Sequence, residues 1–405
     1  MAAPHVDPVE LIGVVGTGTM GAGIAQLALE AGHEVLIHDA DPAAIERGRS
    51  RIRAGLERRA SRLDLDPGSA EAWVDGRLVR LRAAPTLDVL TDADPGLVIE
   101  AALEDLAAKR AIMRTLDAAT WSEAILATNT SALSVEAIAR ATIQPGRVLG
   151  LHFFNPAQVM PLVEVVLAPS TDPAVAERAT RLMVAWGKVT VRCADTPGFI
   201  VNRINRPFTL EALAMLGDGR GTVASIDAAI KVAGYPMGPF ELVDLVGLDI
   251  NLAAAAAIFE RARTAGDPLA ERFRPSPIQE RLVASGQLGR KTGEGFYAYG
   301  PDGGPLGPAQ AFAGTAASAT DLRPDPDVAE RITLAIVNEA YRALGDGVAT
   351  AGDIDLALRL GAGHPIGPFE RVDGLGGPTG VLAALGRHAT DGPRFEPAPA
   401  LVSAG

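Results

Sequence analysis

A histidine and a glutamate stand in neighbouring apolar runs of the sequence. His152 ends the run 148–151, and Glu164 interrupts the run 162–167. An Asn-Pro step and a Met-Pro step between the runs favour turns. If the chain folds back there as a hairpin, the imidazole meets the carboxylate and becomes a general base with a fixed tautomer and a stabilised charged form. The alternative is a core histidine bonded to a backbone carbonyl, with Glu164 on a solvated edge, because periodicity alone cannot show that two runs pair.

A second polar group, Asn129-Thr-Ser131, follows the apolar run 124–128. Open α/β sheets place their sites at the carboxyl ends of their strands. Hydroxyl and amide donors at that edge can stabilise negative charge that develops on a carbonyl oxygen. For Asn129 the alternative is a structural role at the cap of a helix that begins near Ser134, and this alternative is weaker for Ser131.

A glycine-rich turn joins a strand at 11–15 to a helix at 22–30, and a second strand follows at 34–38. In dinucleotide-binding folds the first glycine allows a tight turn, the second lets the backbone approach a pyrophosphate, and the third permits close helix packing. The helix N-terminus then faces the phosphates. An incidental glycine turn lacks this strand, helix and strand context. The residues of the turn are Gly16, Thr17, Gly18, Thr19, Met20 and Gly21.

Asp39 ends the second strand. It lies 21 residues after Gly18 (39 − 18), where the dinucleotide fingerprint requires a carboxylate for the ribose hydroxyl groups. A carboxylate at this position repels a 2′-phosphate. The sequence therefore predicts NAD rather than NADP as the cofactor.

Arginines crowd the predicted helix 41–63, which begins with Asp41 as N-cap and Pro42 in its first turn. A basic helix on a chain whose net charge is −12 indicates an anionic ligand. A solvated helix face is the alternative, and it is the better interpretation for most of these side chains. They are Arg47, Arg49, Arg51, Arg53, Arg58, Arg59 and Arg62.

Strands and helices alternate up to about residue 196, and the elements predicted beyond it are helices. Strands are expected at 78–82, 97–101 and 188–192. This order predicts an α/β fold in which a Rossmann-like dinucleotide-binding domain is followed by two tandem all-α domains. The expected boundaries are 1–196 for the first domain, 197–299 for the first helical domain, 300–324 for a linker rich in Gly, Pro and Ala, and 325–405 for the second helical domain.

The second helical domain is a truncated copy of the first. Residues 225–244 recur as 353–373, each with a Gly-Pro-Phe-Glu motif. Matched pairs include Arg203 and Arg331, Glu211 and Glu339, Asp218 and Asp346, and Arg272 and Arg394. The copy carries Glu330 in place of Asn202, and it ends before any counterpart of the glycine-rich loop 289–297. The duplication predicts two copies that pack together, of which only the first carries the chemistry.

Composition excludes several classes of function. The net charge of −12 argues against nucleic acid as the main partner. The single cysteine, Cys193, permits no internal disulfide, and no metal-binding cluster is recognisable. The N-terminal segment lacks the features of a signal peptide, and the alanine-rich run 252–259 is too short to span a bilayer. We therefore expect a cytoplasmic protein without a metal or a membrane partner.

Several short motifs stand in order along the chain. They are Gly16-Thr-Gly-Thr-Met-Gly-Ala-Gly-Ile-Ala25, Val98-Ile-Glu-Ala-Ala-Leu-Glu104, Thr128-Asn-Thr-Ser131, His152-Phe-Phe-Asn-Pro156, Asp195-Thr-Pro-Gly-Phe-Ile-Val-Asn-Arg203, Tyr235-Pro-Met-Gly-Pro-Phe240 and Gly289-Arg-Lys-Thr-Gly-Glu-Gly-Phe-Tyr297. With them the chain resembles the 3-hydroxyacyl-CoA dehydrogenase family from about residue 11 to residue 299. The tandem copy makes it most similar to the longer bacterial 3-hydroxybutyryl-CoA and 3-hydroxyadipyl-CoA dehydrogenases.

The resemblance implies a role for each candidate site residue. His152 would be the catalytic base and Glu164 its partner. Ser131 and Asn202 would hold the C3 oxygen of the substrate. Beside the glycine turn and Asp39, the path of the nicotinamide cofactor would be lined by Glu104, Lys109, Ser131, Asn155 and Lys291.

The CoA moiety of the substrate is expected near the basic helix. Arg62 falls where the family places a cation for CoA. The position that matches a polar CoA contact of the family is Gly55, so this chain cannot make that contact.

The implied activity is NAD-dependent interconversion of (S)-3-hydroxyacyl-CoA and 3-ketoacyl-CoA, as in fatty acid β-oxidation. The expected pair is 3-hydroxybutyryl-CoA and acetoacetyl-CoA. The alternative substrate is 3-hydroxyadipyl-CoA. The alternative classes of protein are a sugar-acid dehydrogenase of the same fold and a non-catalytic NAD-binding protein. The joint presence of the four candidate catalytic side chains disfavours the last of these. The sequence leaves open whether the chain is a monomer or a homodimer.

Overall fold

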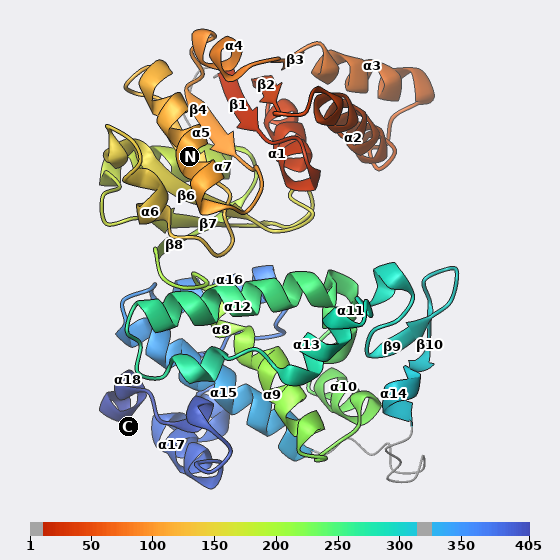
Figure 1. The fold of residues 1–405 in the computed structure, drawn as a ribbon, viewed down its shortest axis with the longest axis vertical. Coiled ribbons are helices and arrows are strands. Elements are labelled where there is room, and N and C mark those ends of the chain that lie inside the picture. The colour runs from red at the N-terminus through yellow and green to blue at the C-terminus, as the bar shows by residue number, and fades with distance from the viewer. Residues whose placement is uncertain (1–10, 314–325) are drawn as a thin grey trace. The chain divides into compact units, whose positions relative to one another are not determined.

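The computed structural model describes residues 11–313 and 326–405. The chain divides into two compact units, Met1–Thr196 and Pro197–Gly405 (Figure 1). The described residues of the first unit form one eight-stranded sheet of order β3-β2-β1-β4-β5-β6-β7-β8. The strands are β1 Leu11–Val15, β2 Glu34–His38, β3 Leu81–Ala83, β4 Leu97–Glu100, β5 Ile125–Thr128, β6 Val148–Phe153, β7 Leu162–Leu167 and β8 Val189–Ala194.

Strands β1 to β6 are parallel, whereas β7 runs antiparallel to β6 and β8 runs parallel to β7. Helices cover both faces of the sheet, which explains why β1 and β5 are continuous apolar runs without alternation. Ile24, Ile52 and Met183 lie in the core of one face, and Leu90 and Met113 lie in the core of the other. The helical elements are α1 Thr19–Glu30, α2 Pro42–Ala60, α3 Pro67–Leu78, α4 Leu87–Asp92, α5 Leu106–Ala119, α6 Val135–Ala139, η1 Pro145–Arg147 and α7 Pro173–Ala185.

The third strand is displaced from its predicted position. The sequence predicted a strand at 78–82, but α3 ends at Leu78 and β3 begins at Leu81. Helix α3 itself was not predicted. Its start carries two local signals, because the carboxylate of Asp66 accepts a hydrogen bond from Ser69 N and Pro67 occupies the first turn.

The second unit contains both helical copies. The first copy comprises α8 Val201–Ile204, α9 Arg206–Gly217, α10 Val223–Val232, α11 Pro239–Val246, α12 Leu248–Thr264, η2 Ala270–Phe273, α13 Pro277–Ala284, η3 Arg290–Thr292, β9 Tyr297–Tyr299, β10 Pro305–Pro308 and α14 Gln310–Ala313. The second copy comprises α15 Pro326–Gly345, α16 Ala351–Ala362, η4 Asp373–Leu375, α17 Gly377–Arg387, η5 Pro393–Phe395 and α18 Pro399–Ala404.

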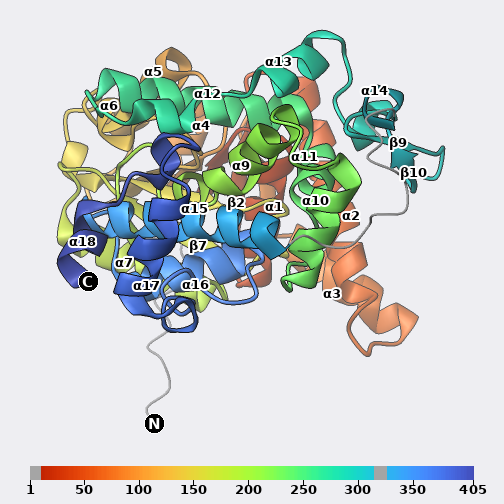
Figure 2. The same ribbon diagram turned by 90° about the horizontal axis from the view of Figure 1, so that it is seen from below.

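The two copies form one body and not two separate domains. Helix α9 packs along α15 (Figure 2). Helix α8 packs against α15 and α16. At the contact the rings of Tyr235 and His364, which occupy matching positions in the two copies, meet edge to face with centroids 5.0 Å apart. The boundary expected after residue 299 therefore separates two sequence repeats that share one core.

The expected linker is partly folded. Strand β10 pairs antiparallel with β9, and the ring of Phe312 in α14 lies 5.3 Å from that of Phe296. This part of the Gly- and Pro-rich segment is held by the hairpin and by an aromatic contact that its composition does not reveal. Residues 314–324 of the expected linker lie outside the described residues.

In the described ranges, no single helix combines the length and the apolar character needed to span a bilayer. Helices α11 and α12 satisfy that test only when they are counted together, and they meet at an angle of 100°.

Candidate active site

The sequence could not decide whether the two apolar runs pair as a hairpin, and in the structure they do. Strands β6 and β7 pair antiparallel, with His152 directly opposite Glu164. The Nδ1 atom of His152 lies 2.5 Å from Oε2 of Glu164. The histidine is 6% exposed and the glutamate is fully buried. A buried carboxylate at this distance fixes the tautomer of the ring and stabilises its protonated form, which is what a general base requires.

The ends of β5 and β6 are aligned by Asn129. Its Oδ1 accepts a hydrogen bond from Phe153 N at 2.9 Å, and its own N donates to Glu100 O at 2.7 Å. The N-cap of α6 is Ser134, whose Oγ accepts from Ala137 N. The capping alternative therefore fits Ser134, while Asn129 holds the strand that carries His152.

The backbone at Ser131 is held by Glu104, which in turn pairs with Lys109. Glu104 Oε1 accepts hydrogen bonds from Thr130 Oγ1 at 2.6 Å and from Ser131 N at 2.9 Å. Its other oxygen lies 3.4 Å from Lys109 Nζ. Burial acts to raise the pKa of Glu104, but Lys109 and these hydrogen bonds outweigh it and hold that pKa below its ordinary value. Glu104 is therefore ionised at neutral pH and fixes the backbone at Ser131.

Lys109 is fully buried, which the sequence did not predict for a residue beside the cofactor. Its Nζ donates to Glu100 Oε1 at 2.8 Å. Glu100, also fully buried, accepts a second hydrogen bond from Thr128 Oγ1 at 2.7 Å. Glu100 was missed, and the signal that could have found it is a glutamate at the end of an apolar run. Lys109 thus lies between two carboxylates and positions Glu104.

The glycine turn has the backbone that a dinucleotide site requires. Gly16 has φ +93°, and a Cβ added there would lie 2.5 Å from Ala101 O. A Cβ at Gly21 would lie 1.8 Å from Gly16 O, so close helix packing excludes any larger residue. Apart from its two neighbours in the chain, no described residue has an atom within 4 Å of a Cβ added at Gly18, which is exposed at the start of α1. These three positions fit the tight turn, the close packing and the open phosphate approach of an NAD site.

Asp39 is held at the end of β2. Its Oδ2 accepts hydrogen bonds from Thr17 N at 2.8 Å and Thr17 Oγ1 at 3.1 Å, and its Oδ1 accepts from Asp41 N at 3.1 Å. A carboxylate has about four lone-pair sites, so acceptor capacity is left for the ribose hydroxyl groups.

The position of Asp39 predicts the preference between NADH and NADPH. We expect NADH to give at least about a tenfold higher kcat/KM than NADPH, because the fixed carboxylate repels a 2′-phosphate. Replacing Asp39→Ser together with Ala40→Arg should narrow or reverse this ratio. Steady-state rates with both cofactors measure it, and a wild-type enzyme that prefers NADPH would contradict the assignment of Asp39.

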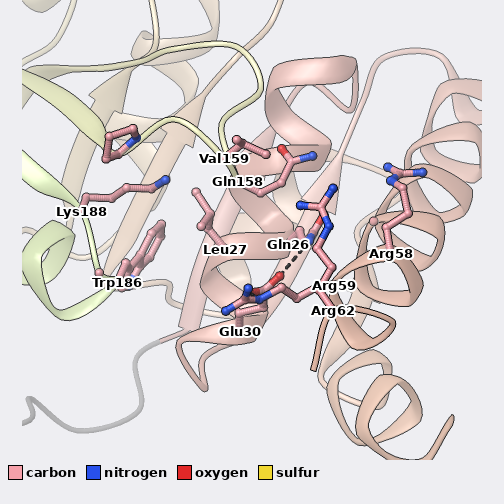
Figure 3. Close-up of a pocket in the computed structure, with 13 residues that line it drawn as sticks. Gln26, Leu27, Glu30, Arg58, Arg59, Arg62, Gln158, Val159, Trp186 and Lys188 are labelled. Carbon is pink, nitrogen blue, oxygen red and sulfur yellow. Dashed lines mark hydrogen bonds and ion pairs between the residues drawn. The ribbon is translucent and has the colours of Figure 1, made fainter. Parts of the chain in front are cut away.

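A pocket of about 460 Å³ opens beside α2 (Figure 3). Arg58, Arg59 and Arg62 line one side, and Lys188 and Trp186 line the other. Burial lowers the pKa of Lys188 to about 8, and its Nζ donates to the carbonyl oxygens of two residues in the β6–β7 connection. Cations outnumber the single acidic group that lines the pocket. The arrangement suits a phosphorylated or otherwise anionic ligand.

Gly55 also lines this pocket, beside the side chain of Gln26. A Cβ at Gly55 would lie 2.0 Å from Gln26 Oε1, so the end of that side chain would have to move. The Gln26 side chain, which donates to Glu30 at 2.7 Å, occupies the space that a polar side chain at Gly55 would need.

The remaining candidates are placed within their own units. Asn155 is exposed in the connection between β6 and β7. Asn202 lies half-buried on α8 of the second unit, and Lys291 lies on η3, where its Nζ is 2.6 Å from Asp249 Oδ1. Their contacts with substrate or cofactor stay predictions. Among the residues that the structure describes, no group of three or more His, Cys, Asp or Glu side chains is arranged to hold a metal ion.

A mostly parallel sheet with this glycine turn, and with a histidine–glutamate pair near the end of β6, is the arrangement of an NAD-dependent dehydrogenase. Residues 11–196 match the 3-hydroxyacyl-CoA dehydrogenase NAD binding domain, and residues 198–299 and 328–404 match the C-terminal domain of the same enzymes. The chain belongs to the 3-hydroxyacyl-CoA dehydrogenase family. The C-terminal match occurs twice, in agreement with the repeat in the sequence.

Individual relatives agree with this assignment. The chain is 35% identical to the 3-hydroxyadipyl-CoA dehydrogenase of Escherichia coli strain K12, over 89% of this chain and 90% of the relative. It is 43% identical to a 3-hydroxybutyryl-CoA dehydrogenase of Mycobacterium tuberculosis, over 72% of this chain and 99% of the relative. A solved 3-hydroxybutyryl-CoA dehydrogenase structure from Escherichia coli has a TM-score of 0.83 at 33% identity and covers 98% of both chains. Family membership removes the sugar-acid dehydrogenase alternative.

Proposed function

We propose that this NAD-dependent 3-hydroxyacyl-CoA dehydrogenase acts on short chains and interconverts acetoacetyl-CoA and (S)-3-hydroxybutyryl-CoA, with His152 as the base. The observation that carries the proposal is the 2.5 Å contact between His152 Nδ1 and Glu164 Oε2 at the end of β6. Support for the short chain comes from relatives named as 3-hydroxybutyryl-CoA dehydrogenases.

Oxidation of a secondary alcohol requires removal of the hydroxyl proton as a hydride leaves C3. NAD, when bound, supplies the hydride acceptor. Glu164 holds Nδ1 of His152, so Nε2 is the nitrogen that takes the hydroxyl proton. The Glu164 carboxylate then stabilises the imidazolium that forms, and in the reverse direction the same proton returns to the C3 oxygen.

Ser131 and Asn202 complete the proposed chemistry. A hydroxyl and an amide donor on the C3 oxygen polarise the ketone and stabilise the charge that develops there. Glu104 fixes the backbone of Ser131 through the 2.9 Å hydrogen bond at its N–H group. The role proposed for Asn202 is inferred from the family motif in which this residue lies.

The pocket at α2 is the proposed site for the charged end of CoA. Arg62 stands where the family places a cation for CoA, and Arg58 and Arg59 add two guanidinium groups from the last turn of α2. Phosphate groups pair well with guanidinium groups, which donate in a planar fork. These charges would bind the CoA phosphates in place of the neutral hydrogen bond that Gly55 cannot make.

Removing charge from this pocket tests the CoA site. The double variant Arg58→Gln, Arg62→Gln should raise KM for acetoacetyl-CoA about tenfold, since each exposed ion pair contributes up to about 1 kcal/mol. The KM for acetoacetyl-pantetheine, which lacks the nucleotide, should not change. Arg49→Gln, on the same helix but outside the pocket, is the control. An equal rise for both thioesters would place the nucleotide elsewhere.

A second candidate substrate is 3-hydroxyadipyl-CoA. The observation that favours it is the Escherichia coli relative of that name, which matches 89% of this chain and so extends into the second helical copy. Comparing kcat/KM for acetoacetyl-CoA, longer 3-ketoacyl-CoAs and 3-ketoadipyl-CoA decides between them. The proposal requires acetoacetyl-CoA to be the best substrate. A higher value for 3-ketoadipyl-CoA would replace it with the dicarboxylate.

A further inference from the structure

Two reciprocal clusters of buried charge join the helical copies. In one cluster, Glu339 of the second copy accepts hydrogen bonds from Arg203 Nε and Arg272 Nε of the first copy, both at 2.7 Å. The other cluster is its counterpart, in which Glu211 of the first copy pairs with Arg331 and Arg394 of the second. Both glutamates are buried, at 3% and 0% exposure. Each copy therefore supplies the acid for the arginines of the other.

The symmetry of the two clusters is incomplete at Arg203. This arginine is held at a second atom, because its Nη2 donates to Asp346 Oδ2 of the second copy at 2.5 Å. Arg331, its counterpart, donates to Glu211 through Nε at 2.8 Å, and within the described residues neither of its Nη atoms makes a hydrogen bond. The carboxylate nearest to its Nη1, at 3.2 Å, is Asp391 of its own copy. Arg203 is thus held by two acids of the other copy, and Arg331 by one.

A third contact from the second copy lies at the end of α8. The Nε2 atom of His364 is 2.8 Å from Oδ1 of Asn205. Helix α8 comprises four residues, 201–204, and so short a helix is not stable without tertiary contacts. Asn202 lies in this helix, close in the chain to the residues that the second copy holds.

We propose that the second helical copy positions Asn202, with Glu339 and Asp346 acting through Arg203 and His364 acting through Asn205. The inference rests on the proposed role of Asn202 at the C3 oxygen. The three residues of the second copy are positioning residues, and they touch neither substrate nor cofactor. The competing explanation is that the clusters only join the copies, which predicts equal consequences for both clusters.

The pseudo-symmetry supplies a matched pair of variants. Glu339→Gln and Glu211→Gln each remove one buried carboxylate that pairs with two arginines, so both substitutions should lower the melting temperature by similar amounts. Only Glu339→Gln should lower kcat for acetoacetyl-CoA, by about tenfold, with the Kd for NADH unchanged. Glu211→Gln should stay within twofold of the wild type. Equal kcat values for the two variants, whether lowered or normal, would overturn the proposal.

A milder pair keeps the test decisive if the buried variants fold poorly. Asp346 is half-exposed and pairs with Arg203, whereas its counterpart Asp218 makes no such pair among the described residues. Asp346→Asn should lower kcat about threefold with little loss of stability, and Asp218→Asn should leave kcat unchanged. The same kcat in both variants would contradict the proposal.

A double-mutant cycle separates this inference from the proposed function. Asn202→Ala should lower kcat about 100-fold, as removal of one donor to a developing oxyanion does. In that background Glu339→Gln should cause no further loss. If Asn202→Ala has normal kcat, the proposed role of Asn202 fails. If Asn202→Ala is impaired and Glu339→Gln reduces kcat equally in both backgrounds, only the positioning inference fails.

Discussion

The variant His152→Gln is expected to lose about 10³-fold in kcat for acetoacetyl-CoA reduction while its Kd for NADH stays unchanged. The loss is large because glutamine cannot take or return a proton, and general acid–base catalysis contributes roughly 10²- to 10⁴-fold. The cofactor turn at Gly16 and the carboxylate of Asp39 are separate from the β6–β7 hairpin and should be unaffected.

The partner residue supplies the control for this prediction. Glu164→Gln keeps a hydrogen-bond acceptor opposite Nδ1 of His152 but removes the charge that stabilises the imidazolium. We expect a smaller loss, of about tenfold, with the fold retained. Near-normal kcat in His152→Gln, or a larger loss in Glu164→Gln than in His152→Gln, would show that the base is assigned wrongly.

Deletion of residues 325–405 is expected to have the largest effect on stability and assembly. It leaves Arg203 and Arg272 of the first copy without Glu339, and it uncovers the face of α9 that packs along α15. Breaking a buried ion pair costs about 3–5 kcal/mol, which corresponds to a fall of about 5 °C in melting temperature for a chain of this size. A newly exposed apolar face also favours association.

Sedimentation velocity and thermal melting measure this prediction together. The truncated chain should dimerise or aggregate and should melt earlier than the full chain. A stable monomer with an unchanged melting temperature would show that the second copy is an independent appendage. In that case the buried arginine–glutamate clusters would contribute nothing measurable to the first copy.

Local patterns in the sequence predicted the cofactor half of the site. The turn from Gly16 to Gly21 and the carboxylate of Asp39 depend on residues close together in the chain, and the structure has the strand, turn, helix and strand that they require. The fold class followed from the same alternation. The prediction of Asp41 as a helix N-cap is also confirmed, because its Oδ1 accepts from Ala43 N at 2.9 Å.

Non-local contacts could not be predicted in the same way. Whether His152 meets Glu164 depends on the register of β6 against β7, and apolar periodicity does not specify register. Lys109 is buried between two carboxylates only because helix α5 packs on the sheet at one position along the strands. The match between Glu211 and Glu339 was visible in the sequence, but their exchange of arginines between copies was not.

Two further differences have local causes. Helix α3 was missed although Asp66 and Pro67 mark its start, because the residues that follow show little apolar periodicity. The segment expected to be a linker contains the strand β10, and the aromatic contact of Phe312 with Phe296 holds it. Composition rich in Gly and Pro therefore does not by itself indicate an unfolded connection.

The most direct test of the central claim compares acetoacetyl-CoA with free acetoacetate as substrates for NADH oxidation by the full-length chain. We expect the CoA thioester to be reduced to (S)-3-hydroxybutyryl-CoA, with kcat/KM at least about 10³-fold above that of the free acid, because the nucleotide and pantetheine supply binding energy to the reaction. Equal or faster reduction of free acetoacetate, or no reduction of any 3-ketoacyl-CoA, would contradict it.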